Sequence, residues 1–417
     1  MTLVEQALAV LHGNDTGLYF KPSQRLYPYQ WNWDSAFVVI GLAGFDPERG
    51  RTEVRSLLEG QWADGMVPHM VFHREVDYRP GPELWESGDC GGAPGVPTSG
   101  LTAPPVLATA VLVLHEAAPD RGFLAEVLPG IESWHAWFHR ERAVDGLVAV
   151  LHPWESADNA PRFDRALARI DVEGIELPDR SDRKVVAAAE RPTDLDYRRY
   201  LALVASLREC GYRPSSPAVA PFAYVDLPLN SILAVAEDDL AVLQDEVGLD
   251  SGRARAGAER LREALGRMWD EEAGAYRERD LHGEAGVTGT VADLFPLYAG
   301  VPDEHQARRL VDEHLFAPDR YGPSPKAPWP VTTVSKSSPA FDPRNYWRGP
   351  VWINVNWFMV RGLERCGLQA EAAELRRLTL ELVARSGFTE YYEPTTGEPL
   401  GSREFSWSAS LTLDLLR

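Results

Sequence analysis

Apolar residues recur every three or four positions through most of the chain, which is the spacing of amphipathic helices. Such patterns cover residues 104–117, 123–142, 227–248, 253–269, 305–316, 351–367 and 369–387. Three of them end at a glycine, at Gly248, Gly367 and Gly387, as helix C-termini commonly do. Strand-like alternation is short and scarce, and GLVAVLHP at 146–153 is the best candidate. The pattern therefore predicts an all-α protein.

Long loops rich in aromatic residues, proline and glycine separate the predicted helices. They cover residues 21–35, 61–103, 152–164, 336–350 and 388–407. Loops of this length are usually functional or disordered, and disordered segments lack aromatics, whereas these hold most of the tryptophans. Helices alternating with ordered loops suit a closed ring of helical hairpins whose loops converge at one end. Periodicity supports the helices and does not by itself establish the ring.

No linker divides the chain, so we expect a single domain over residues 1–417. Its polar, charge-rich segment from about 160 to 200 is predicted to be an insertion or flap over the body. We expect the whole insertion, roughly 160–215, to be a small helical cap or flap. If it closes over a bound molecule, it would exclude water and contribute to specificity.

Composition narrows the classes of partner. The chain is 44% hydrophobic, which allows a substantial core, and its formal net charge of −20 argues against nucleic acid and anionic membranes. An anionic substrate would have to be held by a few placed arginines. Cys90, Cys210 and Cys366 are odd in number and far apart, which favours a reducing compartment. Because the longest apolar run, 36–45, is about half of a membrane span, we expect a cytoplasmic protein.

The first constellation that could carry chemistry is YPYQWNWDSAF at 27–37. Trp31 and Trp33 could pack against the C–H face of a pyranose while Asn32 and Asp34 bind neighbouring hydroxyls. The alternative is an apolar helix start with Asp34 as its cap.

His69 and His73 are four residues apart, a spacing that can hold zinc on a helix. The glutamate of a zinc-protease motif is absent between them, and no third ligand has suitable spacing. A hydrogen bond to substrate or core is the better interpretation. No glycine-rich phosphate loop, GxSxG elbow or paired CxxC occurs either, so no metal and no cofactor is expected.

The loop HPWESADNAPRFD at 152–164 places Glu155, Asp158 and Asp164 near Trp154. A carboxyl group against apolar rings has a raised pKa and could donate a proton near neutral pH. The alternative is an Asx-turn at Asp158–Asn159 tied down by Arg162.

Two further loops supply partner groups. NYWRGPVW at 345–352 offers hydrogen-bond donors and aromatic platforms ahead of a helix, and a helix start that only packs needs neither Arg348 nor two flanking tryptophans. The segment 388–410 holds Glu390, Glu393 and Glu404 among tyrosines and a tryptophan. Glycoside hydrolysis needs two carboxyl groups, one to protonate the leaving oxygen and one to activate water, so a carboxylate here could face the acid of the first loop.

Taken in order, the strings YQWNWDSAF, TSGLTAPP, WESADNAPRFD, NYWRGPVW and EYYEPTTGEPLGSREFSWSA span nearly the whole chain. In them the chain resembles glycoside hydrolase family 63, inverting α-glycosidases built on an (α/α)6 barrel. Within the family it is most similar to the bacterial mannosylglycerate and glucosylglycerate hydrolases. The resemblance places the general acid at Asp158 and the general base at Glu390, the first glutamate of an E-x-Y-x-P string, with Glu393 in a variable position.

The resemblance also implies contacts to the sugar and glycerate, at Tyr27, Trp31, Trp33, Asp34, His69, Trp347, Trp352 and Glu404. Residues of the same loops complete the expected substrate site: Tyr78, Trp154, Arg348, Gly349, Tyr391 and Trp407. For the glycerate carboxylate we propose Arg199 in DYRRY, helped by the hydroxyls of Tyr27 and Tyr78, although Arg199 is equally well a surface helix charge. One departure is TAPP where the family often has TQPP, so Ala103 lacks an amide contact.

Together with the two loop carboxyl groups, the resemblance implies inverting hydrolysis of a small anionic substrate, 2-O-α-mannosyl-D-glycerate or glucosyl-D-glycerate, to hexose and D-glycerate. Inversion requires the two carboxyl groups to stand ~6.5–9.5 Å apart, so that a water fits between base and sugar. Two alternatives stay open: an α-glucosidase or trehalase-like hydrolase of a neutral disaccharide, and a sugar-binding protein or epimerase on the same ring. The sequence leaves undecided the choice between mannose and glucose, any activation by a divalent ion, and whether a homo-oligomer forms.

Overall fold

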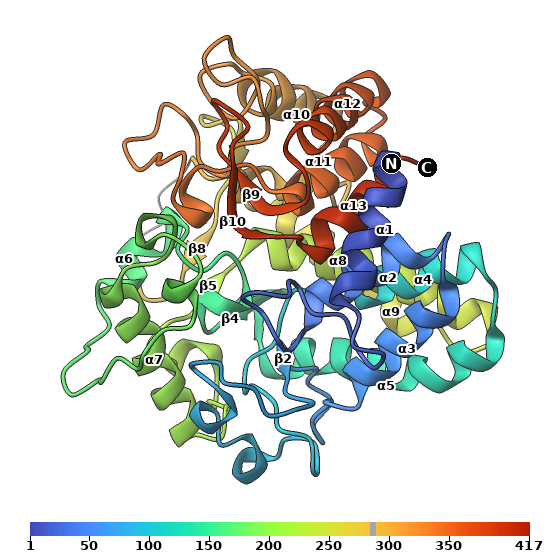
Figure 1. Cartoon of the computed structure of the whole chain (residues 1–417), viewed down its shortest axis with the longest axis vertical. Helices are drawn as coiled ribbons and strands as arrows, with labels where there is room; N and C mark the ends of the chain where they lie inside the picture. Colours follow the sequence, from blue (N-terminus) through green and yellow to red (C-terminus); the bar gives the residue numbers. More distant parts are fainter. Residues whose placement is uncertain (284–288) are drawn as a thin grey trace.

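Within the described residues, 1–283 and 289–417 of a computed structural model, six buried elements form a closed ring (Figure 1). In chain order they are α2 (Asn32–Leu42), α4 (Leu107–Ala117), α8 (Leu227–Glu246), the 3-10 helix η8 (Val291–Leu297), α11 (Ile353–Arg365) and α13 (Ser406–Leu415). Each contacts the next, and α13 closes the ring against α2.

An outer layer of helices surrounds this ring. It consists of α3 (Pro47–Leu58), α5 (Arg121–Glu141), α9 (Gly252–Gly266), α10 (Glu304–Leu310), α12 (Gln369–Ser386) and α1 (Leu3–Asn14). The first five each follow an inner element along the chain. The sixth, α1, packs on α13, so the two ends of the chain lie side by side (Figure 1). This arrangement is the (α/α)6 barrel, and it confirms the predicted all-α ring.

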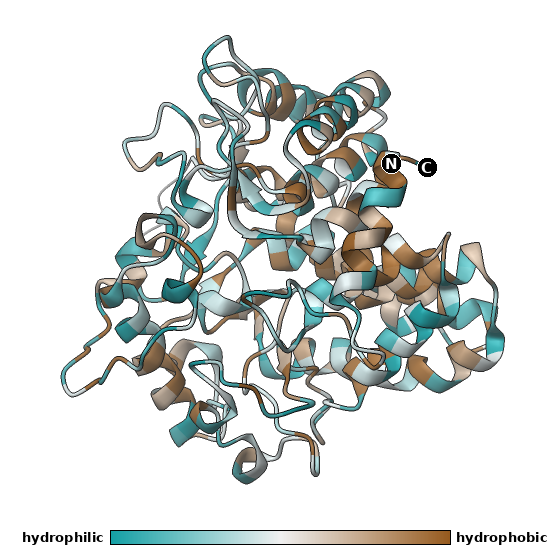
Figure 2. Cartoon of the chain, viewed as in Figure 1, coloured by the Kyte–Doolittle hydropathy of each residue, from teal (hydrophilic) through white to brown (hydrophobic). Residues whose placement is uncertain are grey.

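The two layers differ in hydrophobic pattern. All ten residues of α13 and ten of the eleven in α2 are buried. A helix that is buried on every side has no exposed polar face, so its sequence lacks the helical spacing of polar and apolar residues. The outer α9 instead buries one stripe, at residues 254, 257, 258, 261, 264 and 265. Figure 2 shows the contrast between apolar central helices and mixed peripheral ones. The fully buried α13 was missed, and α2 begins where a helix start was only the alternative interpretation. The outer α3 buries one face and was missed as well, whereas the inner α4, α8 and α11 lie in segments predicted to be helical.

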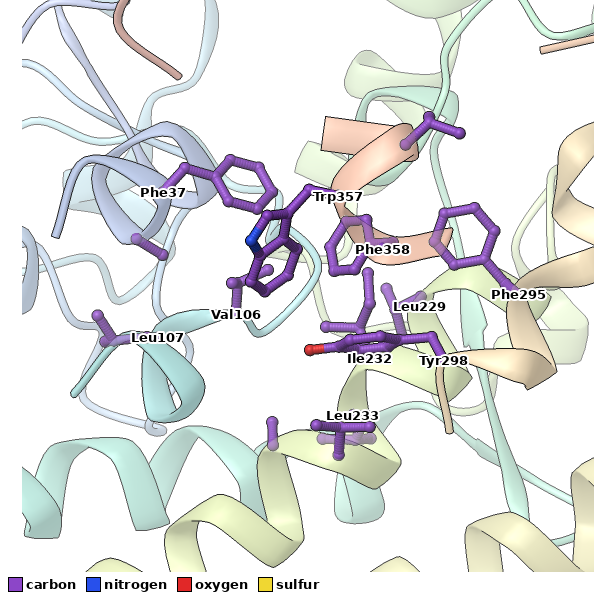
Figure 3. Packing of buried hydrophobic residues seen from close by; sticks show 14 of the residues in the cluster. Phe37, Val106, Leu107, Leu229, Ile232, Leu233, Phe295, Tyr298, Trp357 and Phe358 are labelled. Atoms are coloured by element: carbon purple, nitrogen blue, oxygen red, sulfur yellow. The ribbon is translucent and has the colours of Figure 1, made fainter. Parts of the chain in front are cut away.

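Aromatic side chains of different inner elements meet in the core (Figure 3). The ring of Phe358 on α11 lies 5.8 Å from that of Phe37 on α2 and 5.4 Å from that of Phe295 on η8, measured between centroids. Tyr298, directly after η8, contacts Phe358 edge-on at 4.8 Å. Truncating a buried phenylalanine typically costs about 3–5 kcal/mol, so these contacts hold neighbouring elements of the ring together.

The predicted helix ends can now be compared with the structure. Gly248, Gly367 and Gly387 adopt positive φ angles of 74–75° at the ends of their helices, as predicted. Helix α4 begins at Leu107 and not at 104, because a residue that precedes proline avoids the helical conformation and two prolines stand at 104–105. Helix α10 ends at Leu310, where one π-helical turn replaces the α-helix predicted to reach 316.

The short strands lie between the helices. Strands β3 (Ala143–Val144), β4 (Leu147–Val150), β5 (Tyr224–Val225) and β8 (Arg279–Asp280) form one antiparallel sheet in that order, and β4 confirms the strand predicted at 146–153. Two-stranded pairs are β1 (Gln30–Trp31) with β2 (Met70–Val71), β6 (Trp269–Asp270) with β7 (Ala275–Tyr276), and β9 (Thr389–Tyr392) with β10 (Pro399–Arg403). The prediction of a loop over 388–407 was wrong, because it contains this last hairpin and the start of α13.

Residues 151–223 leave the sheet from β4 and return to it at the adjacent β5. This excursion carries the loop of Asp158 and two helices, the short α6 (Asp164–Leu167) and α7 (Asp194–Glu209), as a helical cap would; the bounds of α7 were not predicted. In Figure 1 it forms the green part of the molecule.

The described helices include none with the length and apolar character of a membrane span. All three cysteines are free, as the prediction of a reducing compartment requires. The compartment itself stays a prediction, and so does the oligomeric state.

Candidate active site

A cavity opens where the inner helices begin. Several of its lining residues precede or start α2, α4, α11 and α13, and others come from the loops between helices, so the aromatic loops meet there as expected. Eleven of the predicted site residues line it: Tyr27, Trp31, Trp33, Asp34, His69, Tyr78, Trp154, Asp158, Trp347, Glu390 and Trp407. Segments from residue 27 to residue 407 thus contribute to one site.

The loop of Asp158 is fixed at several points. Glu155 is fully buried and forms a two-pronged ion pair with Arg142, both N–O distances being 2.9 Å. Asp164 is exposed and pairs with Arg348 at 2.6 Å. Neither Glu155 nor Asp164 lines the cavity, so Asp158 is the carboxyl group that this loop presents to it.

The alternative of an Asx-turn tied down by Arg162 is not what the structure shows. The guanidinium of Arg162 forms ion pairs with Asp226 and Glu278 and donates to the hydroxyl of Ser156. The Asp158 backbone is held instead by the hydroxyl of Tyr200, which donates to its carbonyl oxygen at 2.9 Å.

Burial decides the protonation of Asp158. The side chain lies among aromatic rings and only 8% of the residue is exposed. Loss of solvation raises the pKa of Asp158 to about 7. Arg191 opposes this shift and the charge of Glu390 adds to it. At neutral pH a substantial fraction of Asp158 therefore carries a proton to donate.

Glu390 is placed by an irregularity in the β9–β10 hairpin. Gly401 and Ser402 together stand opposite Glu390 between two regular residue pairs, and such a bulge leaves a backbone N–H out of the strand ladder. The free N–H of Ser402 donates to Glu390 Oε2 at 2.9 Å. Gly401 has a φ of +66°, and a Cβ atom there would lie 2.5 Å from Glu390 Oε2, so only glycine fits beside this carboxylate.

Charged and hydroxyl donors also bind Glu390. Arg191 makes two hydrogen bonds to it, from Nη2 to Oε2 at 2.5 Å and from Nη1 to Oε1 at 3.1 Å. The hydroxyl of Tyr27 donates to Oε1 at 2.7 Å. These charge-assisted hydrogen bonds fix the position of the carboxylate in the cavity.

The other glutamates of this segment have different surroundings. The carboxylate of Glu393 accepts hydrogen bonds from the backbone of Thr395 and from Thr396. Burial raises the pKa of Glu393, but these hydrogen bonds outweigh it, so the pKa lies below its usual value. It caps its own turn and lies outside the cavity. Glu404 is exposed, and its backbone carbonyl accepts a hydrogen bond from Asn14. The prediction that Glu404 contacts the sugar is therefore corrected.

Five more predicted residues lie outside the cavity lining. Trp352 is fully buried and stacks on Trp347 at 3.9 Å and on Tyr391 at 4.7 Å, so Trp352 and Tyr391 support the cavity wall from behind. Arg348 joins its own loop to that of Asp158 by binding the carbonyl oxygen of Asn159 in addition to Asp164. Gly349 allows close approach of the backbone, because a Cβ would lie 2.4 Å from the carbonyl oxygen of Asp342.

Arg199, which was predicted to bind the glycerate carboxylate, also lies outside the cavity lining. It lies on α7, where its Nη1 contacts Asp196 at 3.4 Å. Among the described residues Arg191 is the arginine that lines the cavity. Arg191 follows the 3-10 turn η6 (Ala188–Glu190) and was missed, because a charge-rich segment gives no sign of which arginine turns inward.

The segment around Arg191 is anchored on both sides. Before it, Glu190 accepts a hydrogen bond from the N–H of Gly401 at 3.0 Å, and its carbonyl oxygen accepts one from the hydroxyl of Tyr391 at 2.7 Å. After it, the buried Arg180 donates to the carbonyl oxygen of Pro192 at 2.9 Å. The two bonds of Glu190 attach the segment to the hairpin of Glu390, and the bond from Arg180 holds it within the insertion.

Several polar atoms of the cavity wall have no hydrogen-bond partner among the described residues. Besides Nε of Arg191, they include Oδ1 of Asp34 and the indole nitrogens of Trp85 and Trp407. Asp34 does not cap α2, which has no side-chain cap, so the alternative role considered for it is excluded. Buried polar groups are almost always hydrogen-bonded, so these three atoms suit the hydroxyls of a sugar.

The two histidines of the HxxxH pattern have separate surroundings. Nδ1 of His69 contacts the hydroxyl of Ser99 at 2.5 Å, and burial lowers the pKa of His69 to about 3, so it lines the cavity uncharged. His73 contacts Gln30 at 2.7 Å. In the described ranges no group of three or more His, Cys, Asp or Glu side chains is arranged to hold a metal ion.

A helical barrel with two carboxyl groups in one aromatic cavity is the architecture of a glycoside hydrolase. The family model described as the mannosylglycerate hydrolase MGH1-like glycoside hydrolase domain matches residues 27–408. The chain belongs to this family, within glycoside hydrolase family 63.

Individual relatives are similar over their full length. A mannosylglycerate hydrolase of Thermus thermophilus is 41% identical over 98% of this chain and 99% of its own. The glucosylglycerate hydrolase of Mycolicibacterium hassiacum is 37% identical over 99% and 97%. The crystal structure of a family 63 mannosylglycerate hydrolase from a second strain of T. thermophilus, in complex with Tris and D-glycerate, matches with a TM-score of 0.92 at 39% identity, covering all of both chains.

Proposed function

We propose that this enzyme hydrolyses an α-glycoside of D-glycerate, mannosylglycerate or glucosylglycerate, with inversion at the anomeric carbon. The observation that carries the proposal is the presence of two carboxyl groups with different surroundings in one cavity. Burial keeps a substantial fraction of Asp158 protonated near neutral pH, while Arg191 forms an ion pair with Glu390. One relative named a mannosylglycerate hydrolase and another named a glucosylglycerate hydrolase are similar to nearly the whole chain, which supports this substrate class over a neutral disaccharide.

In the proposed mechanism, Asp158 protonates the glycosidic oxygen as the bond to the anomeric carbon breaks. Glu390 accepts a proton from the water that attacks from the opposite face of the sugar. Trp31 and Trp33 offer apolar faces to the ring, and Asp34 and Trp407 have free polar atoms for its hydroxyls.

Arg191 takes the place that we first assigned to Arg199. It is a buried cation in the cavity wall, and its Nε has no hydrogen-bond partner among the described residues, so a donor remains for a second carboxylate. The hydroxyls of Tyr27 and Tyr78 lie in the same wall. We propose that these groups bind the glycerate carboxylate.

We also propose that residues 160–215 act as the cap of the site. This stretch contributes Asp182, Arg191 and Tyr197 to the cavity wall, together with loops of the barrel itself. A cap that carries the carboxylate-binding arginine would cover the glycerate end of the substrate and exclude water from it.

The test is release of D-glycerate from each glycosylglycerate by the wild type, Asp158→Asn and Glu390→Gln. We expect release from at least one substrate, and a loss of roughly 10²–10⁴-fold in either variant, the range typical of removing a general acid or base. Trehalose serves as the neutral comparison. Turnover of trehalose without turnover of either glycosylglycerate would contradict the proposed substrate class.

A further inference from the structure

The carboxylate of Glu390 is fully occupied by donors. Oε1 accepts from the hydroxyl of Tyr27 at 2.7 Å and from Arg191 Nη1 at 3.1 Å. Oε2 accepts from Arg191 Nη2 at 2.5 Å and from the N–H of Ser402 at 2.9 Å. A carboxylate has about four lone-pair positions, and these four hydrogen bonds use them all.

A general base must accept a hydrogen bond from the attacking water before it takes the proton. Glu390 can do so only if one of its four donors leaves. The N–H of Ser402 is part of the backbone of the bulge, and Tyr27 supplies a single bond. Arg191 supplies one bond to each oxygen, so its departure frees both.

We infer that Arg191 blocks Glu390, and that the carboxylate of the substrate's aglycone removes the block by drawing the guanidinium to itself. This inference rests on the proposed function, since it requires an anionic aglycone within reach of Arg191. An anionic aglycone replaces one charge-assisted pair of Arg191 by another of the same kind. A neutral aglycone offers no replacement, so the base stays blocked and hydrolysis stays slow.

The surroundings of Arg191 allow such an exchange. Its guanidinium carbon lies 4.7 Å from the centre of the Tyr346 ring, 5.8 Å from that of Tyr27 and 5.9 Å from that of Tyr391. Aromatic faces attract a cation with little directional demand, so the guanidinium can shift between two carboxylates and keep these contacts. The backbone stays anchored through Glu190. Arg191 thus determines specificity for an anionic aglycone by acting on the base.

A glycosyl fluoride separates this effect from binding of the aglycone. In the α-fluoride of the substrate's hexose, the C1–F bond breaks and fluoride leaves, while water forms the new C1–O bond and gives its proton to Glu390. The position of the aglycone stays open for added D-glycerate. We expect saturating D-glycerate to accelerate fluoride release by the wild type roughly tenfold or more, and equimolar glycerol to have no such effect. Inhibition by D-glycerate, or an unchanged rate, would overturn the inference.

The variant Arg191→Met removes the charge and keeps an apolar side chain of similar length. Its fluoride hydrolysis should equal or exceed the glycerate-stimulated wild-type rate and should not respond to D-glycerate. Arg199→Met is the matched control, because Arg199 lies outside the cavity, and it should behave as the wild type does. A folded Arg191→Met enzyme with the unstimulated wild-type rate would show that Arg191 does not block the base.

Failure of this inference can be distinguished from failure of the proposed function. If the wild type hydrolyses a glycosylglycerate but D-glycerate does not stimulate fluoride release, the inference that Arg191 blocks Glu390 is contradicted. The proposed function is then unaffected. If the wild type hydrolyses neither glycosylglycerate nor fluoride, with or without D-glycerate, both are contradicted. The wild-type measurement decides the matter even if the variant does not fold.

Discussion

Replacing Asp158 by asparagine removes the proton donor and keeps the shape of the side chain. With the pKa of Asp158 raised by burial to about 7, about half of the molecules carry the proton at pH 7. At the ordinary value of 3.8, only about one in a thousand would. We therefore expect Asp158→Asn to lower kcat/KM on glycosylglycerate by about 10²–10⁴-fold at pH 7, because asparagine has no proton to give.

The pH profile of kcat/KM measures this directly, since it reports the groups of the free enzyme. The acid form of Asp158 is lost as the pH rises through about 7, so kcat/KM should fall about tenfold per pH unit above it. Asp164→Asn is the control: it changes an exposed carboxylate of the same loop whose surface ion pair contributes about 1 kcal/mol or less, and it should keep wild-type activity. A wild-type profile that is flat from pH 7 to 9, or an Asp158→Asn enzyme with more than about a tenth of wild-type activity, would refute the reasoning.

Two further predictions concern the groups behind the site. Glu155→Gln leaves the buried Arg142 without its charged partner, so it should lower the free energy of unfolding by about 3–5 kcal/mol. Urea denaturation measures this change, and a loss below about 1 kcal/mol would contradict a structural role for the pair. Gly401→Ala forces a Cβ into contact with Glu390 and should lower kcat about 10²-fold. Gly248→Ala is the control, because its φ is similarly positive and nothing lies within 4 Å of the added Cβ. It should lose about 1–2 kcal/mol of stability and keep its activity.

Most helices of the outer layer could be predicted from the sequence, because a helix with one face in solvent alternates polar and apolar residues at helical spacing. Helix α9 buries residues at a helical spacing, and its apolar pattern was visible. The inner helices α2 and α13 are buried all round, and α13 starts within a stretch that had the composition of a loop. Closure of the ring depends on contacts between α13 and α2, at opposite ends of the chain, which periodicity does not report.

The site was predicted where motifs and chemistry agreed, and missed where position depends on the cap. Asp158 and Glu390 stand in distinctive strings, and the structure places both in one cavity. Glu404 stands in an equally distinctive string, yet its side chain faces outward. Arg191 and Arg199 are eight positions apart in a polar segment, and only tertiary contacts such as that of Glu190 with the hairpin of Glu390 determine which of them reaches the cavity.

The central claim is that Asp158 and Glu390 act on opposite sides of one sugar, with a water between the sugar and the base. The stereochemistry of the first-formed hexose tests this claim most directly. Proton NMR of early turnover of the α-glycosylglycerate should show the β-anomer of the hexose, followed by mutarotation to the equilibrium mixture. Initial release of the α-anomer would mean net retention, and it would contradict an inverting pair formed by these two carboxyl groups.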